Sequence, residues 1–89
     1  MGQFILWGVY CEDALQKRKP FREEHLKRLS ELKKEGILIT LGPTKCNTHV
    51  FGIFKGEYIE DIKKLIKEDI YWREGIWIDF EIYSWIQAF

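Results

Sequence analysis

The 89-residue chain carries 14 lysine and arginine residues and 14 aspartate and glutamate residues, so its formal net charge is zero. Its basic pairs have acidic neighbours, which argues against the basic patch typical of nucleic-acid binding. No apolar run approaches the roughly 20 residues of a membrane span, and the first residues do not resemble a secretion signal. We therefore expect residues 1–89 to form a single cytoplasmic domain that contacts neither nucleic acid nor membrane.

Large apolar side chains are abundant for so short a chain. Hydrophobic residues make up 46% of it and aromatic residues 16%, including four tryptophans, which is more bulky surface than a small domain readily buries. This surplus favours association with a second copy of the chain. The cysteines, Cys11 and Cys46, are too far apart in sequence to indicate a zinc knuckle or a disulfide framework. A metal site at Cys46 and His49 is a weak alternative, because structural metal sites use more ligands.

Hydrophobic periodicity and turn residues predict four strands and two helices. In chain order these are a strand at 4–11, a helical segment at 20–36, strands at 37–41 and 49–55, a helix at 58–69 and a strand at 76–86. Pro20 suits the first helical turn, and Gly36 suits the left-handed residue that follows a helix. Gly42 and Pro43 end the second strand. One further helical turn is expected after Asp13.

This order of elements predicts a ferredoxin-like α+β sandwich, in which both helices cover one face of a four-stranded antiparallel sheet. The last strand alternates, so Ile76, Ile78, Phe80, Ile82 and Ile86 are predicted to face the helices, and Trp77, Asp79, Glu81, Tyr83 and Trp85 the opposite face. A homodimer that pairs two such open faces would bury Trp77 and Trp85. The two carboxylates would lie at its rim or, as an alternative, form a second acidic site.

One histidine is predicted on the inner face of the first helix. His25 lies four residues before Leu29 and seven before Leu32, whereas Arg28 and the lysines are assigned to the solvated face. The two helices are antiparallel in the predicted fold, so the start of the first lies beside the end of the second. Asp69 continues the apolar stripe at that end. We therefore expect His25 and Asp69 to converge.

A carboxylate beside a histidine fixes the tautomer and orientation of the imidazole, which suits a general acid or base. At the same end of the fold, Arg18 and Arg22 are positioned to anchor an anionic group of a small-molecule substrate, and Tyr10 and Tyr71 supply hydroxyls. In the alternative interpretation, these polar groups only cap helices or pair with one another. No motif for a nucleotide or another cofactor is present.

Several of these residues resemble the YCII-related (YciI-like) domain family. The similarity lies in the run Arg22-Glu23-Glu24-His25-Leu26, in Gly42-Pro43 and in Glu68-Asp69-Ile70-Tyr71, and it extends over essentially the whole chain. It implies a dimeric α/β barrel of ferredoxin-like protomers, with His25 and Asp69 as the active pair. It also implies proton transfer on small, often cyclic or aromatic compounds, by elimination, isomerisation or dehalogenation, with Arg22 and Tyr71 holding the substrate.

Two features depart from the family pattern. Ile70 stands where the family usually has a proline after the acidic residue, and the turn between Pro43 and His49 is short, which leaves less room for a lid.

The rival functional class is a dimeric binding module that holds a small ligand in the same cleft without turning it over. Loss of turnover in a folded His25→Ala variant would favour the enzyme, whereas ligand binding that survives His25→Gln without any reaction would favour the binding module.

Overall fold

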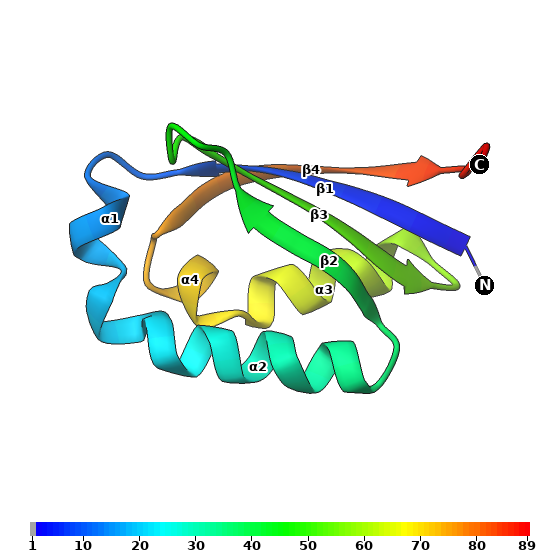
Figure 1. Ribbon diagram of the computed structural model, residues 1–89, viewed down its shortest axis with the longest axis horizontal. Coiled ribbons are helices and arrows are strands. Elements are labelled where there is room, and N and C mark those ends of the chain that lie inside the picture. The colour runs from blue at the N-terminus through cyan, green and yellow to red at the C-terminus, as the bar shows by residue number, and fades with distance from the viewer. Residues whose placement is uncertain (1) are drawn as a thin grey trace.

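The computed structural model describes residues 2–89, and its element order is the predicted one with a 3-10 turn and one further short helix added (Figure 1). The elements are β1 (Gly2–Tyr10), α1 (Ala14–Lys17), a 3-10 turn (Lys19–Phe21), α2 (Arg22–Lys34), β2 (Leu38–Pro43), β3 (His49–Gly56), α3 (Ile59–Glu68), α4 (Ile70–Arg73) and β4 (Trp77–Trp85). The helical turn expected after Asp13 is α1. No helix among residues 2–89 has the length and apolar character needed to cross a membrane.

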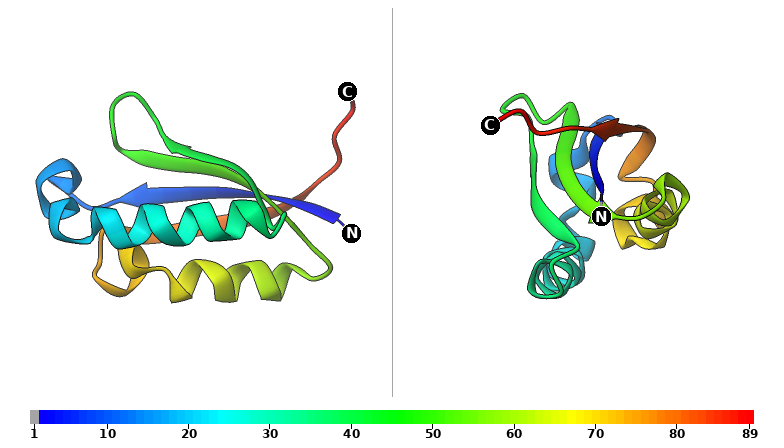
Figure 2. Two further views of the ribbon diagram at one scale, coloured as in Figure 1. Left: turned by 60° about the horizontal axis from the view of Figure 1, so that its bottom comes forward. Right: turned by 90° about the vertical axis from the view of Figure 1, so that its right-hand side faces the viewer.

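The four strands form one antiparallel sheet in the order β2-β3-β1-β4. Figure 2 shows α2 and α3 side by side on one face of this sheet, while the opposite face, which we call the outer face, is left without a helix. The predicted ferredoxin-like sandwich is therefore confirmed. The start of α2 lies at the same end of the molecule as the end of α3, as the antiparallel arrangement requires.

The ends of α2 show how local sequence sets its position. Pro20 lies in the 3-10 turn, and regular α-helix begins two residues later, at Arg22. At the other end, Gly36 adopts a φ of 79°, the left-handed conformation that glycine takes without steric cost. The helix is thus shorter at its start than predicted, but the chain turns into β2 at the predicted glycine.

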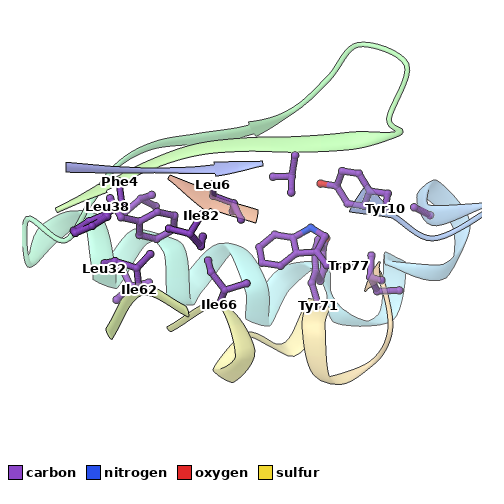
Figure 3. Close-up of a cluster of buried hydrophobic side chains, with 14 residues drawn as sticks. Phe4, Leu6, Tyr10, Leu32, Leu38, Ile62, Ile66, Tyr71, Trp77 and Ile82 are labelled. Carbon is purple, nitrogen blue, oxygen red and sulfur yellow. The ribbon is translucent and has the colours of Figure 1, made fainter. Parts of the chain in front are cut away.

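A continuous apolar layer fills the space between the sheet and the helices (Figure 3). Phe4, Leu6 and Tyr10 point into it from β1, and Ile62 and Ile66 from α3. Each such aliphatic side chain stabilises the fold by roughly 1.5–3 kcal/mol when it is fully buried. Tyr10, Tyr71 and Trp77 lie together at the end of the layer where β1 ends, and this is the end that carries the candidate site.

Close packing of β1 against β3 depends on a glycine. A Cβ atom at Gly8 would lie 2.7 Å from Cγ1 of Val50, which is fully buried on the neighbouring strand. The missing side chain therefore makes room for Val50 in the apolar layer.

The strict alternation predicted for the last strand is wrong at Trp77 and Ile78, whereas Ile76 is buried as predicted. Val9 pairs with Asp79, but the next residue of β1, Tyr10, pairs with Trp77, so Ile78 has no partner on β1. This β-bulge adds one residue to β4 and reverses its inside-outside order. Trp77 is consequently buried and Ile78 is 55% exposed.

Beyond the bulge the predicted faces hold. Phe80 and Ile82 face the helices. The residues that alternate with them face the outer side of the sheet, and these are Asp79, Glu81, Tyr83 and Trp85. Ile86 lies past the end of β4 and is exposed, so its assignment to the inner face is also wrong. Trp77 belongs to the interior of the protomer rather than to the predicted dimer interface.

Candidate active site

His25 lies one turn into α2 and is almost completely buried, with 4% of its surface exposed. Its ring stacks on Tyr71 with centroids 3.6 Å apart and planes within 11° of parallel. The indole of Trp77 meets the same ring edge-on, with centroids 5.2 Å apart. Aromatic contacts thus fix the plane of the imidazole from two directions.

Asp69 lies in the break between α3 and α4, where its backbone is extended (φ −70°, ψ 140°). Its Oδ1 atom accepts a hydrogen bond from the backbone N–H of Tyr71 at 2.9 Å, which caps α4. The same Oδ1 lies 2.8 Å from Nδ1 of His25. The predicted convergence of these two side chains is present, although Asp69 follows the helix end instead of continuing the helix.

Arg28 is the third partner of this pair, and its assignment to the solvated face of the helix is wrong. Its guanidinium donates one hydrogen bond to Oδ2 of Asp69 at 3.1 Å and another to the backbone carbonyl of Leu65 at 2.9 Å. The Arg28 side chain is 25% exposed, whereas Asp69 is 1% exposed. A buried carboxylate needs such an opposite charge, because burial without a partner costs several kcal/mol.

The three contacts of Asp69 determine which hydrogen-bonding role falls to His25. A carboxylate with donors at both oxygens acts only as an acceptor, so Nδ1 of His25 donates its hydrogen to Oδ1. In the neutral imidazole this leaves Nε2 without a hydrogen. Nε2 is then the atom that can take up a proton.

A pocket of about 120 Å³ opens beside this pair. Its lining consists of Tyr10, Arg18, Arg22, His25, Leu26, Leu29, Leu41, Gly42, Pro43 and Tyr71. The structure therefore brings five of the six predicted site residues to one pocket, and it places the sixth, Asp69, behind His25. The leucines and the proline add an apolar wall that the sequence analysis did not assign to the site.

The pocket combines a cationic side with hydroxyl groups. Burial raises the pKa of the Tyr71 hydroxyl above its usual value, and the positive charges of Arg18 and Arg22 only partly oppose this effect. Tyr71 therefore keeps its proton at neutral pH and is a hydrogen-bond donor. Arg18 and Arg22 line the same pocket, and a guanidinium is a group that can pair with an anion.

Trp77 is the buried aromatic residue that the sequence analysis did not place here. Its indole nitrogen is buried and has no hydrogen-bond partner among residues 2–89. On the neighbouring strand, Tyr10 is its paired residue, and the two side chains lie at the same end of the apolar layer (Figure 3). The β-bulge that turns Trp77 inward leaves no signature in the sequence periodicity.

No group of three or more His, Cys, Asp or Glu side chains within residues 2–89 is arranged to hold a metal ion. Cys46 and His49 each contact the hydroxyl of Thr48 between them. These contacts belong to the turn that joins β2 and β3.

The fold and the site together define a ferredoxin-like α+β protein with a histidine–carboxylate pair at the wall of a small pocket. The model of the YCII-related domain family matches residues 2–86, and the chain belongs to this family.

One solved structure similar to this chain is 5-chloro-2-hydroxyhydroquinone dehydrochlorinase from Burkholderia phenoliruptrix AC1100, in complex with 2,5-dihydroxybenzoquinone. The two share 21% sequence identity over 97% of this chain and 95% of that one, with a TM-score of 0.83. At this identity the similarity establishes the shared fold. A comparison with curated proteins gives no significant match.

Proposed function

We propose that this protein is a small-molecule enzyme that transfers protons with His25 as the acid or base and Asp69 as the group that orients it. The observation that carries the proposal is the 2.8 Å contact between Nδ1 of His25 and Oδ1 of Asp69 at the wall of an open pocket. A histidine buried for packing alone would also need a partner for its ring N–H, so the pocket beside the imidazole is what supports a catalytic role. The pair with Arg28 behind it and a pocket in front is the arrangement that general acid–base catalysis requires.

In the proposed mechanism, Nε2 of His25 takes a proton from a substrate bound in the pocket. Asp69 keeps the Nδ1 hydrogen in place and stabilises the imidazolium that forms. Arg18 and Arg22 balance negative charge on the substrate, and the Tyr71 hydroxyl donates to an oxygen on which charge develops. A general acid or base such as His25 typically accelerates a reaction by about 10²–10⁴-fold.

The size and lining of the pocket favour a substrate of about one ring. A volume of about 120 Å³ with an apolar wall, aromatic side chains and two arginines suits a planar compound with an anionic oxygen. The structural neighbour is a dehydrochlorinase in complex with a dihydroxybenzoquinone, a compound of this kind. We therefore propose elimination, isomerisation or dehalogenation of hydroxylated rings as the reaction class.

The test is a turnover screen with chlorinated hydroxyhydroquinones and related hydroxylated rings. Chloride release and ultraviolet absorbance are the two readouts. The wild-type protein should turn over at least one compound, and His25→Gln should reduce kcat by about 10²–10⁴-fold with the fold retained. His49→Gln is the matched control, because His49 stacks on Trp7 and does not line the pocket. If ligands bind equally to wild type and His25→Gln and neither converts any compound, the protein is a binding module.

We also propose that the outer face of the sheet pairs with a second copy of the chain. Trp7 and Phe51 are direct cross-strand neighbours on that face and are 39% and 38% exposed, and Tyr83 on β4 is 50% exposed. Analytical ultracentrifugation should give the mass of a dimer for the wild type and of a monomer for Phe51→Lys. Leu15→Lys changes an exposed leucine on α1 and should leave the dimer intact; a monomeric wild type would contradict the proposal.

A further inference from the structure

A groove of about 290 Å³ lies between α2 and β2, the strand at one edge of the sheet. Three of the side chains that line it also line the pocket beside His25, and these are Leu26, Leu29 and Leu41. The groove and the pocket therefore adjoin at these leucines. A ligand that fills the pocket has the groove next to it.

Helical spacing sets the direction of the groove. Leu26, Leu29 and Lys33 follow one another at intervals of three and four residues, so they lie along one line of α2. At about 1.5 Å per residue, Lys33 lies about 12 Å further along the helix axis than His25. A ligand that starts beside His25 and follows this line reaches Lys33.

The groove and the pocket offer different kinds of surface. The pocket has the aromatic rings of Tyr10, His25 and Tyr71 in its wall. Within residues 2–89, the lining of the groove includes four leucines and no aromatic side chain. Leu26, where the two adjoin, is 43% exposed, so an apolar ligand there would remove leucine surface from water. The pocket thus suits a ring, and the groove suits an aliphatic chain.

Charge is also distributed unevenly over this surface. Although the chain has no formal net charge, the residues between 2 and 89 that line the pocket or the groove include Arg18, Arg22 and Lys33 and no aspartate or glutamate. Lys33 forms no ion pair within the part of the chain that the structure describes. The residues three and four positions before and after it are uncharged. Its ammonium is therefore available to an anionic group of a ligand.

We propose that the groove binds an apolar arm of the same substrate whose ring occupies the pocket, and that this arm ends in a carboxylate that pairs with Lys33. The inference rests on the proposed function and narrows its substrate class to hydroxylated rings that carry a carboxyalkyl chain. An extended chain advances about 1.2 Å per bond, so about six carbons and the flexible stem of Lys33 together span the distance.

The experiment measures binding by isothermal titration calorimetry, with resorcinol and its hexyl, hexanoate and hexanamide derivatives as probes. Each methylene of the hexyl arm should tighten binding about twofold, which is half the free energy of full burial, because the arm stays partly in contact with solvent. The hexyl derivative should therefore bind at least about tenfold more tightly than resorcinol. Backbone amide signals of Ser30 and Lys33, which line the groove alone, should shift with the compounds that carry an arm and not with resorcinol.

Lys33→Met tests the ion pair. The wild type should bind the hexanoate about two- to fivefold more tightly than the hexanamide, the range of an exposed ion pair. In Lys33→Met this ratio should fall to about one. Lys34→Met is the matched control, because Lys34 is the next lysine of α2 and lies outside the groove, so its ratio should equal that of the wild type. Equal ratios in the two variants would overturn the ion pair.

The outcomes also separate the groove from the proposed reaction, because binding is measured without turnover. Selective binding of the hexanoate by a protein that converts no ring compound supports the groove and contradicts the acid–base assignment. Turnover of hydroxylated rings with no gain from any arm overturns the groove and leaves the reaction standing. The inference is also wrong if the signals of Ser30 and Lys33 shift with protein concentration instead of with ligand, since a second copy of the chain would then cover the groove.

Discussion

Arg28→Met tests whether the guanidinium balances the buried charge of Asp69. The substitution keeps an unbranched apolar stem but removes the guanidinium, and with it the hydrogen bonds to Oδ2 of Asp69 and to the Leu65 carbonyl. A hydrogen bond to a charged group contributes about 1.5–3 kcal/mol, and removal of one partner of a fully buried ion pair costs about 3–5 kcal/mol.

The cost should fall below that upper range for two reasons. Arg28 is 25% exposed, so solvent screens part of its interaction, and Asp69 keeps His25 and the Tyr71 N–H as donors. We therefore expect a loss of about 2 kcal/mol in the free energy of unfolding, or roughly 8–16 °C in Tm for a domain of this size.

The assay is thermal and urea unfolding followed by far-ultraviolet circular dichroism, at one fixed protein concentration because association shifts apparent stability. Lys27→Met, one residue earlier on the exposed side of α2, should change stability by less than about 0.5 kcal/mol. In an Asp69→Asn background, Arg28→Met should have a smaller effect, since the charge is already gone. The reasoning fails if Arg28→Met and Lys27→Met shift the unfolding midpoint equally.

Substitutions at Tyr71, Trp77 and Gly8 test other parts of the structure. The folded state holds the Tyr71 proton to higher pH than the unfolded chain does, so Tyr71 contributes to a loss of stability as the pH rises above 10. Tyr71→Phe should flatten that loss, as measured by urea midpoints on either side of this pH. Trp77→Phe removes an unpartnered N–H whose burial costs about 1–3 kcal/mol, and this gain offsets the loss of buried surface. The free energy of unfolding in urea should therefore change by less than about 1 kcal/mol. Trp77→Ala, in contrast, should lower it by about 3–5 kcal/mol. Gly8→Ala places a Cβ 2.7 Å from Val50 and should cost about 1–3 kcal/mol in thermal unfolding, part of which Val50→Ala recovers.

Each of these predictions has an outcome that contradicts its basis. An unchanged alkaline stability profile in Tyr71→Phe would mean that this hydroxyl is not desolvated. A loss of more than about 3 kcal/mol in Trp77→Phe would mean that its indole N–H has a partner in solution. Full stability of Gly8→Ala would mean that β1 and β3 have room for a methyl group there.

The fold could be predicted from the sequence because apolar residues recur every three to four positions in the helices and every second position in most of the last strand. The meeting of His25 with Asp69 also follows from spacing, once antiparallel helices place the start of one beside the end of the other. Two short-range patterns thus combined into a long-range contact between α2 and the end of α3.

The remaining parts of the site depend on features that periodicity does not contain. Trp77 enters the site through a single extra residue in β4, and such a bulge depends on the pairing of two strands rather than on either strand's composition. Arg28 follows His25 by three residues, a spacing that places both on neighbouring parts of the helix surface. Its long side chain then reaches Asp69, although its position alone suggested solvent exposure.

The bulge in β4 also shows which sequence changes this part of the strand can accept. Ile78 is the residue without a partner on β1, and more than half of its surface is exposed, so many side chains should be tolerated there. Its deletion would restore strict alternation and leave Trp77 opposite Tyr10, still facing His25, with the rest of the sheet in register. Neither the identity nor the presence of a residue at this position decides the contact between Trp77 and His25, so a one-residue gap here in an alignment would not mean that the contact is lost.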